Sequence, residues 1–223
     1  STAGSHLIFL SGLIIMSIAI AKDWFKTNKL FASLLIYVPP VIALIIMAVK
    51  TNIVRLLQIV LNPSIEPMGN GYGGMLISDL LSRSYFLGVG NLPDKYAGRD
   101  FPLPYSNSDY LLTYLICHLG WIAFIIIMVV LLFFIIKGFM LCAKQKSVLG
   151  LLVSVSIMLT FTMQVIGYVI SNFTGLTLFQ VFPLPFLSYA NAPNIINLPL
   201  IGLMLSVFRT GDVAKDKPVN VIK

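Results

Sequence analysis

The chain has 223 residues, of which 58% are hydrophobic and only 10% are charged. Soluble domains carry about 25% charged residues, and the mean hydropathy of this chain is +0.94. Composition therefore excludes a soluble globular enzyme, a disordered tail and a disulfide scaffold, and it predicts an all-α polytopic membrane protein. The two cysteines, Cys117 and Cys142, lie in apolar sequence without metal-ligand spacing, so we expect both to pack as small hydrophobic side chains.

The chain opens with Ser1 and enters a hydrophobic run within six residues, and we expect it to be the back portion of a longer protein. A helix needs about 20 apolar residues to cross a bilayer, and five segments are candidates. The predicted spans are Leu7–Ala21, Phe31–Val49, Tyr110–Ile136, Val148–Ile170 and Ile195–Phe208. Residues 50–109 form a long loop between the second and third spans, and residues 209–223 form a tail.

The distribution of basic residues predicts which side of the membrane each loop lies on. Ten of the 15 Lys and Arg residues follow the first, third and fifth spans, and these residue types concentrate on the cytoplasmic side. The sequence therefore predicts a cytoplasmic C-terminal tail and an extracytoplasmic loop over residues 50–109. The net charge of +7 is a signal of topology, and no basic stripe interleaved with aromatic residues supports a nucleic-acid partner.

The loop over residues 50–109 is too long for a simple connector, since loops of more than about 15 residues are usually functional or disordered. Here apolar runs alternate with turn signals, so we expect it to be structured. Ile53–Leu61 is typical of an amphipathic helix that stops at Asn62-Pro63. Asn70-Gly71 and Gly73-Gly74 indicate turns, and Met75–Phe86 predicts a second surface helix.

Asp109 is the ionisable residue that physical reasoning singles out, because it precedes the uncharged run of the third span. Carboxylates at a membrane boundary are costly and tend to be functional. Partial desolvation would raise the pKa of Asp109 towards the range of a general base. The alternative is structural: Ser108 or Asp109 would cap the next helix by accepting from its free N–H groups. Spacing alone favours the cap.

Other reactive residue types form no recognisable site in the sequence. His118 lies nine residues after Asp109 and on a different helix face, so we expect a buried structural histidine. No group of His, Cys and Asp has zinc spacing, and no phosphate-binding glycine motif occurs. Ser188 lacks the flanking glycines of a hydrolase nucleophile.

Three stretches, in order, resemble the motifs of one family. Residues 103–110, L-P-Y-S-N-S-D-Y, are similar to the family's Leu-Pro-Glu-x-x-Thr-Asp-Phe, and Leu119-Gly120 follows as in the family. Residues 183–189, P-L-P-F-L-S-Y, are close to its Pro-Leu-Pro-Phe-x-Ser-Tyr, and Arg55, Asn62-Pro63 and residues 69–72 echo its outer-loop pattern. Beyond Lys50 most of the chain thus resembles the SEDS family (shape, elongation, division and sporulation), the FtsW/RodA/SpoVE-like cell-wall polymerases.

The resemblance implies a ten-span fold, of which this chain would hold the last five spans. It implies a glycosyltransferase of the bacterial plasma (inner) membrane that polymerises lipid II, an undecaprenyl-pyrophosphate-linked disaccharide peptide, into glycan strands. It also implies a class B penicillin-binding protein as partner. In the family an essential Asp stands at the position of Asp109, and this match reverses the preference for a helix cap.

The resemblance also suggests which residues would bind the substrate. Arg55 matches a family position and would neutralise the leaving pyrophosphate, and Ser188 and Tyr189 belong to the third motif. Weaker candidates are Arg83, Lys95 and Arg99, which are better explained as charges at lipid headgroups. A divalent cation, Mg²⁺ or Mn²⁺, is an alternative source of positive charge.

Some positions depart from the family's motifs. Tyr105 replaces a Glu, Cys117-His118 replaces Glu-Glu, and Ala190-Asn191-Ala192 replaces Gly-Gly-Ser. These departures support a second hypothesis, a catalytically degenerate scaffold of the division or elongation complex. A third hypothesis is a transporter (flippase) of the lipid-linked precursor, but a transporter should carry ionisable groups near mid-bilayer, and the predicted spans offer only uncharged groups such as Gln164.

Overall fold

The computed structural model describes residues 12–20, 28–51, 53–69, 71–92, 101–103, 106–175, 184, 187, 189 and 191–210. Within these residues every regular element is helical. Residues 12–20 are helical, and the elements that follow are α2 (Lys29–Thr51), α3 (Ile53–Leu61), η1 (Pro63–Ile65), α4 (Tyr72–Ser82), α5 (Leu111–Leu119), α6 (Trp121–Ala143), α7 (Val148–Thr174) and α8 (Asn191–Thr210). This confirms the all-helical class that composition predicts.

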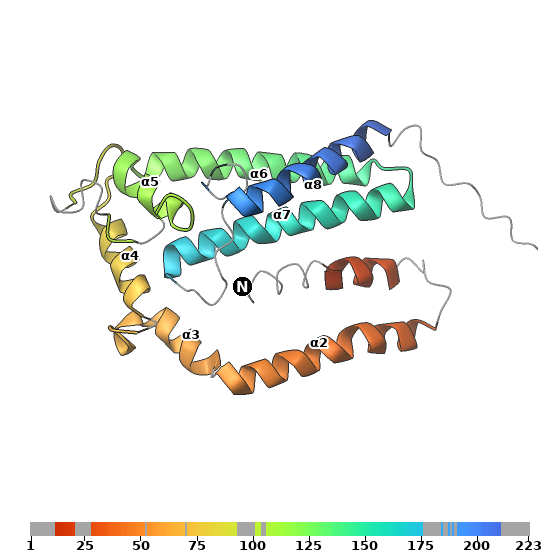
Figure 1. The fold of residues 1–223 in the computed structure, drawn as a ribbon, viewed down its shortest axis with the longest axis horizontal. Coiled ribbons are helices and arrows are strands. Elements are labelled where there is room, and N and C mark those ends of the chain that lie inside the picture. The colour runs from red at the N-terminus through yellow and green to blue at the C-terminus, as the bar shows by residue number, and fades with distance from the viewer. Residues whose placement is uncertain are drawn as a thin grey trace, which may run out of the picture.

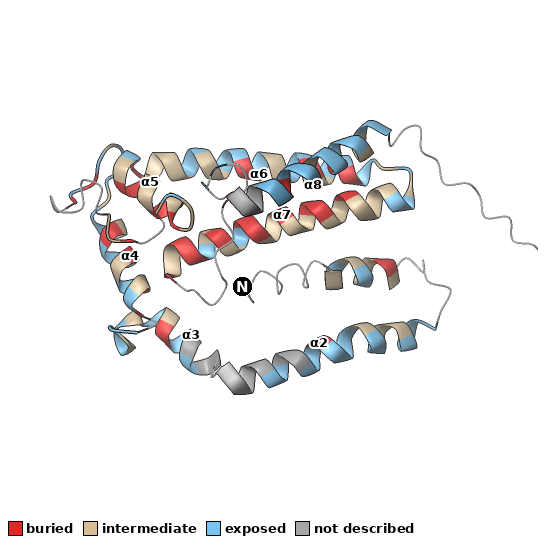
Figure 2. Ribbon diagram, in the orientation of Figure 1, coloured by how far each residue is buried: buried red, intermediate tan, exposed pale blue. Residues whose placement is uncertain are grey.

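Helix α7 is the centre of the arrangement. It contacts α6, α8, α4 and α5, and Figure 1 shows α6 and α8 running alongside it. The Ser147 side chain caps its N-terminus by accepting from the N–H of Gly150. Its C-terminus ends at Gly175, which adopts the left-handed conformation (φ 64°) that favours glycine. Buried residues concentrate along α7, as Figure 2 shows.

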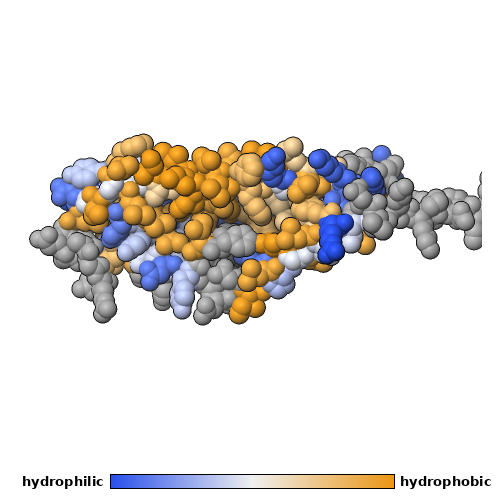
Figure 3. All heavy atoms as spheres, turned by 90° about the horizontal axis from the view of Figure 1, so that it is seen from above, coloured by the Kyte–Doolittle hydropathy of each residue, from blue (hydrophilic) through white to orange (hydrophobic). Residues whose placement is uncertain are grey.

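Two helices among the described residues, α6 and α7, are long and apolar enough to cross a membrane by length and composition. Shorter apolar helical stretches cover Lys29–Ile42 and Ile195–Thr210. Apolar side chains of α6 face outward, with Val130 61% and Phe133 62% exposed, as expected for a helix that faces lipid. On the face seen in Figure 3, hydrophobic residues cover the middle and hydrophilic residues gather towards the ends.

Three hydrophobic clusters hold the helices together. The cluster between α4 and α5 comprises Ile77, Leu80, Leu92, Leu103, Tyr110 and Cys117. The central cluster comprises Leu112, Leu131, Val165, Tyr168 and Leu184, and the third, at the other end of α7, comprises Cys142, Ile157, Met158, Phe161 and Met204. Cys117 and Cys142 are buried and free of disulfides, which confirms the prediction that they pack as small hydrophobic side chains.

The predicted third span, residues 110–136, is wrong as one continuous helix. Gly120 separates α5 from α6 with a φ of +90°, and a Cβ there would lie 2.6 Å from the carbonyl oxygen of Phe86. The loop after α4 supplies hydrogen bonds at the break: the N–H of Trp121 donates to Tyr85 O (3.1 Å), and the N–H of Gly88 donates to Leu119 O (3.1 Å). Contact with a distant loop therefore divides the apolar run.

The outer-loop helices agree with the sequence in part. The helix expected over Ile53–Leu61 is confirmed as α3. The helix expected over Met75–Phe86 is instead α4, Tyr72–Ser82, and the turn expected at Gly73-Gly74 is wrong because both glycines lie in its first turn. A Cβ on Gly74 would lie 2.8 Å from Thr174 O, so glycine is what lets α4 pack against the end of α7. This packing makes α4 part of the folded core.

Candidate active site at the C-terminal end of α7

Asp109 lies in the turn before α5, close to the C-terminal end of α7. Its side chain is half-buried, and burial raises the pKa of Asp109 above its ordinary value of 3.8, while a hydrogen bond from the Ser108 side chain lowers it in part. The N-cap of α5 is Tyr110, and no side chain of the cap residue makes a capping hydrogen bond. The structural interpretation of Ser108 or Asp109 as the helix cap is therefore wrong.

Side chains of α7 take the place of the missing cap. The N–H of Leu111 donates to the Tyr168 hydroxyl (3.0 Å), and the N–H of Thr113 donates to Asn172 Oδ1 (3.1 Å). Both N–H groups belong to the first turn of α5, where a helix has no backbone acceptors of its own. A neighbouring helix thus satisfies groups that a local side chain satisfies in most helices.

The same two α7 residues also hold the backbone around Asp109. The Tyr168 hydroxyl donates to Ser108 O (3.0 Å), and Asn172 Nδ2 donates to Asp109 O (2.9 Å). The Thr113 hydroxyl completes the set by donating to Asn172 O (2.9 Å). We call Tyr168, Asn172 and Thr113 the α7–α5 clamp. All three are at most 2% exposed. The hydrogen bonds between Thr113 and Asn172 are buried, and those to residues 108, 109 and 111 are part-buried.

Sequence reasoning missed the clamp, although a signal for it exists. Tyr168 and Asn172 are polar residues near the end of an apolar helix, and their spacing of four places them on one helix face. That spacing predicts that Tyr168 and Asn172 bind the same neighbouring segment, but it does not identify the segment.

The structure brings two of the family-like stretches together. The N–H of Tyr189 donates to Asn107 O (3.1 Å), which joins residues 183–189 to residues 103–110. Leu184 is fully buried in the cluster that holds Leu112 and Tyr168. The Tyr189 side chain is exposed, and Ser188 lies outside the described residues.

The two predicted cations that the structure describes, Arg55 and Arg83, are each paired with a carboxylate other than Asp109. Arg55, which is mostly exposed, is ion-paired with Glu66. Arg83 is paired with Asp79 one helical turn away, with 3.0 Å between Arg83 Nε and Asp79 Oδ1. Lys95 and Arg99 lie outside the described residues. The described part of the chain contains no group of three or more His, Cys, Asp or Glu side chains that could hold a metal ion.

Cys117 and His118, which stand where the resembled motif has Glu-Glu, are both engaged in packing. Cys117 Sγ accepts a hydrogen bond from the Ser84 hydroxyl (3.5 Å). His118 stacks on Tyr114, with 4.1 Å between ring centroids, and its Nδ1 lies 2.9 Å from Tyr114 O. The prediction of a buried histidine holds only in part, because His118 is half-buried.

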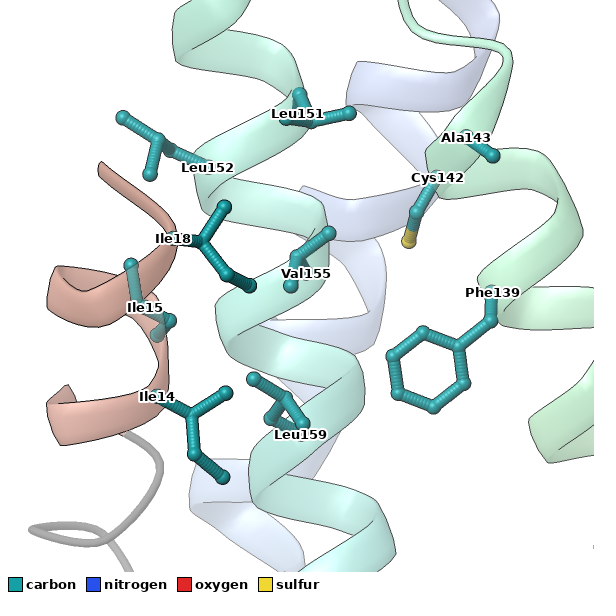
Figure 4. A pocket seen from close by; sticks show the side chains of 10 residues that line it. All are labelled: Ile14, Ile15, Ile18, Phe139, Cys142, Ala143, Leu151, Leu152, Val155 and Leu159. Carbon is teal, nitrogen blue, oxygen red and sulfur yellow. The ribbon is translucent and has the colours of Figure 1, made fainter. Parts of the chain in front are cut away.

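An apolar pocket of about 410 Å³ lies at the other end of α7. Figure 4 shows side chains from residues 12–20, α6 and α7 around it: Ile14, Ile15, Ile18, Phe139, Cys142, Ala143, Leu151, Leu152, Val155 and Leu159. None of these residues is ionisable apart from the cysteine. The pocket is thus separate from Asp109, because it is lined from the N-terminal half of α7, whereas Asp109 is bound by Asn172 in the last turn.

Comparison with known proteins identifies the family. Residues 2–212 match the FtsW/RodA/SpoVE family, described as "Cell cycle protein". One relative is the probable peptidoglycan glycosyltransferase FtsW of Buchnera aphidicola subsp. Schizaphis graminum, 26% identical over 204 residues, which are 90% of this chain and 55% of the relative. Another is stage V sporulation protein E of Bacillus subtilis, 28% identical over 156 residues, 67% of this chain and 40% of the relative.

A third relative is the probable peptidoglycan glycosyltransferase FtsW of Trichlorobacter lovleyi, 24% identical over 151 residues, 66% of this chain and 38% of the relative. The chain thus spans about half the length of the curated relatives it matches. The family match covers nearly all of the chain and confirms the resemblance found in the motifs. The chain belongs to the FtsW/RodA/SpoVE (SEDS) family of polytopic membrane proteins linked to cell-wall synthesis, division and sporulation.

Proposed function

We propose that this chain is the last five spans of a ten-span peptidoglycan glycosyltransferase, which polymerises lipid II beside a class B penicillin-binding protein. Two of the relatives carry the name of probable peptidoglycan glycosyltransferase. The observation that carries the proposal is the half-buried Asp109, whose pKa is raised by burial, in the segment where residues 103–110 meet residues 183–189. A raised pKa suits a general base.

In the proposed reaction Asp109 accepts a proton from a sugar hydroxyl of the acceptor. As the proton moves to the carboxylate, the hydroxyl oxygen forms a bond to the anomeric carbon of the donor sugar. The bond between that carbon and the pyrophosphate oxygen breaks, with inversion, and the electron pair leaves with the lipid pyrophosphate. A sugar hydroxyl is a poor nucleophile near neutral pH, so a positioned base lowers the barrier, typically by a factor of about 10² to 10⁴.

The departing pyrophosphate needs positive charge, and Arg55 is our first candidate to supply it. Its guanidinium already binds a carboxylate, that of Glu66. Arginine binds phosphate as well as carboxylate oxygens through its N–H donors, so exchange of Glu66 for pyrophosphate is the step we propose. Ser188 and Tyr189 are proposed to bind the sugar-peptide part of the substrate, and Arg83, Lys95 and Arg99 are weaker candidates for the pyrophosphate.

A catalytically degenerate scaffold is the second candidate function, and one observation favours it. Cys117 packs between α4 and α5, and His118 stacks on Tyr114 of its own helix, so the carboxylates that the resembled motif has at these positions are replaced by side chains engaged in packing. A transporter has less support. No Asp, Glu, Lys or Arg is buried in the described parts of α6 and α7, where Gln164 pairs instead with Asn197 of α8.

The test uses the complete protein, purified with its penicillin-binding partner and supplied with lipid II. We expect glycan strands from the wild type and none above background from Asp109→Ala and Asp109→Asn, measured on gels. The matched control is Asp79→Ala, which removes an exposed carboxylate of the same loop that is paired with Arg83. This control should retain polymerisation.

Two results would contradict the proposal. Polymer from Asp109→Ala at the wild-type rate would exclude Asp109 as the base. Absence of polymer from the wild type, beside an active family member, would favour the scaffold. Omitting or adding Mg²⁺ and Mn²⁺ in the same assay tests whether a divalent cation takes part.

A further inference from the structure

We propose that Tyr168 and Asn172 of α7 are positioning residues that fix Asp109 for proton transfer, an inference that rests on the proposed function. The two side chains make hydrogen bonds on both sides of Asp109 along the chain. Upstream, the Tyr168 hydroxyl donates to Ser108 O, and downstream it accepts from Leu111 N–H, both at 3.0 Å. Asn172 Nδ2 donates to the carbonyl of Asp109 itself at 2.9 Å.

The pattern uses both the donor and the acceptor groups of the two side chains. A phenol hydroxyl has one proton to donate and lone pairs to accept, and Tyr168 uses both kinds of site on the backbone around Asp109. The Asn172 amide donates from Nδ2 and accepts at Oδ1 from Thr113 N–H at 3.1 Å. Asn172 Nδ2 also lies 3.0 Å from Tyr168 O, within α7. The contacts made by the two side chains reach the main chain of residues 108–113, so the carboxylate is positioned through its backbone.

Burial gives this arrangement its rigidity. Tyr168 is 0% exposed and Asn172 is 2% exposed, and a buried donor or acceptor without a partner is costly. Because the side chains of Tyr168 and Asn172 are buried, release of residues 108–113 would leave their polar groups without partners at the end of α7. Positioning is where such rigidity affects catalysis, because a misplacement of about 1 Å can lower a rate by a factor of about 10².

The first test measures turnover of the complete protein with lipid II. Tyr168→Phe removes only the hydroxyl, and Asn172→Leu removes both amide functions at similar volume. We expect kcat to fall by a factor of about 10 to 100 with KM changed less than about twofold, because the base is displaced while substrate contacts persist. The matched control is Ser171→Ala, at a position between the two residues in the sequence. It removes a buried hydroxyl, which donates to Tyr168 O of the same helix. It should leave kcat unchanged.

Thr113 provides a test of hydrogen bonding against volume. Thr113→Ser keeps the hydroxyl that donates to Asn172 O, and Thr113→Val keeps the shape without that donor. We expect the serine variant to retain kcat and the valine variant to lose it. Equal kcat in the two variants would show that the hydrogen bond to Asn172 O does not matter for turnover, and a higher kcat in the valine variant would show that packing matters instead.

A second readout does not depend on activity. In an Asp109→Cys protein, we expect Tyr168→Phe and Asn172→Leu to raise the rate at which a charged maleimide labels the introduced thiol several-fold, and Ser171→Ala to leave that rate unchanged. The native Cys117 and Cys142 are buried, and labelling of the protein that keeps Asp109 gives the background.

The outcomes separate this inference from the proposed function. Faster labelling together with lower kcat supports positioning by Tyr168 and Asn172. Unchanged labelling in both variants overturns it whatever the activity, and so does faster labelling with unchanged kcat when Asp109→Ala is inactive. Full activity of Asp109→Ala overturns the proposed function and, with it, the catalytic purpose of the clamp.

Discussion

Asp109 combines two properties that favour a base over a structural carboxylate. Its side chain is half-buried, and the helix that follows takes its capping hydrogen bonds from α7. The carboxylate is thus relieved of the common structural role of an Asp at this position. Burial disfavours the charged form and raises the pKa.

The raised pKa predicts the pH dependence of turnover. A general base acts only when deprotonated, so the polymerisation rate should rise with pH through the pKa of Asp109, at a pH above the ordinary Asp value of 3.8. Ser108→Ala removes the hydrogen bond that lowers this pKa, so its profile should shift to still higher pH. The measurement is the initial rate across the acid range. A midpoint at or below 3.8 for the wild type would contradict the prediction.

The stability of the fold also depends on the protonation of Asp109, but folding favours the protonated form, whereas the proposed reaction needs the charged form. The folded protein binds the Asp109 proton more tightly than the unfolded chain does, because the folded pKa is raised. The stabilising contribution of the protonated carboxyl is therefore complete below the unfolded pKa, and it is lost as the pH rises through the folded pKa. The charged form of Asp109 that the proposed reaction needs is thus the form that burial disfavours in the folded protein.

At the scale of single residues, the sequence identifies Asp109 as the candidate base but does not predict which residues surround it. A lone carboxylate beside an apolar run is visible without any structure. Tyr168 and Asn172 are 57 to 63 residues from the backbone groups they bind, so their role depends on how the helices pack. Pairing of Arg55 with Glu66 is equally hidden, since eleven residues and a helix end separate the two.

At the scale of the helices, the apolar pattern of the sequence predicts some helix boundaries and misses others. Residues 53–61 and the start of α7 at Val148 follow from periodicity and flanking polar residues. The break at Gly120 does not, because Gly120 sits in a run that is apolar on both sides. Its cause is the backbone of residues 85–88, which approaches it and accepts or donates hydrogen bonds at the gap. The apolar pattern within one segment of the sequence cannot predict a contact with a distant segment.

The break predicts a specific sensitivity to side chains. Gly120 has φ +90° and ψ 174°, a region that is essentially restricted to glycine. Gly120→Ala should lower the free energy of unfolding by about 1–3 kcal/mol from backbone strain, with a further loss from contact with Phe86 O. Thermal unfolding in detergent is the measurement.

Gly202→Ala is the matched control, because a Cβ there meets nothing within 4 Å and alanine favours the helix over glycine by about 1 kcal/mol. Its melting temperature should stay the same or rise. An unchanged melting temperature in Gly120→Ala would show that the break tolerates a side chain.

The molecule as a whole has the surface of a membrane protein. Large apolar side chains of α2 and α6 are exposed, among them Phe31 (64%), Leu35 (63%) and Phe133 (62%). Lys137, near the C-terminal end of α6, and Lys144, in the turn that follows, lie at the end of the molecule opposite Asp109. Excess positive charge marks the cytoplasmic side, so we propose that the turn is cytoplasmic and Asp109 extracytoplasmic.

Labelling in intact cells tests this orientation in the complete protein. Asn107→Cys, next to Asp109, and Lys144→Cys, in the turn between α6 and α7, change two exposed positions. A membrane-impermeant maleimide should label the Asn107→Cys variant in intact cells and the Lys144→Cys variant only after the membrane is broken. The reverse pattern would invert the proposed topology. The protein without either change gives the background from the buried native cysteines.

The last turn of α7 supports two parts of the molecule at once: the first turn of α4, through Gly74 and Thr174, and the backbone of residues 108–113. Its 27 residues form a rod about 40 Å long, at 1.5 Å per residue. If the helix tilts as a rigid body about its N-terminal end near Ser147, its C-terminal end moves furthest. Because α4 and the backbone at Asp109 both contact that end, they would move together. The rate of a reaction at Asp109 would then report the tilt of a single helix.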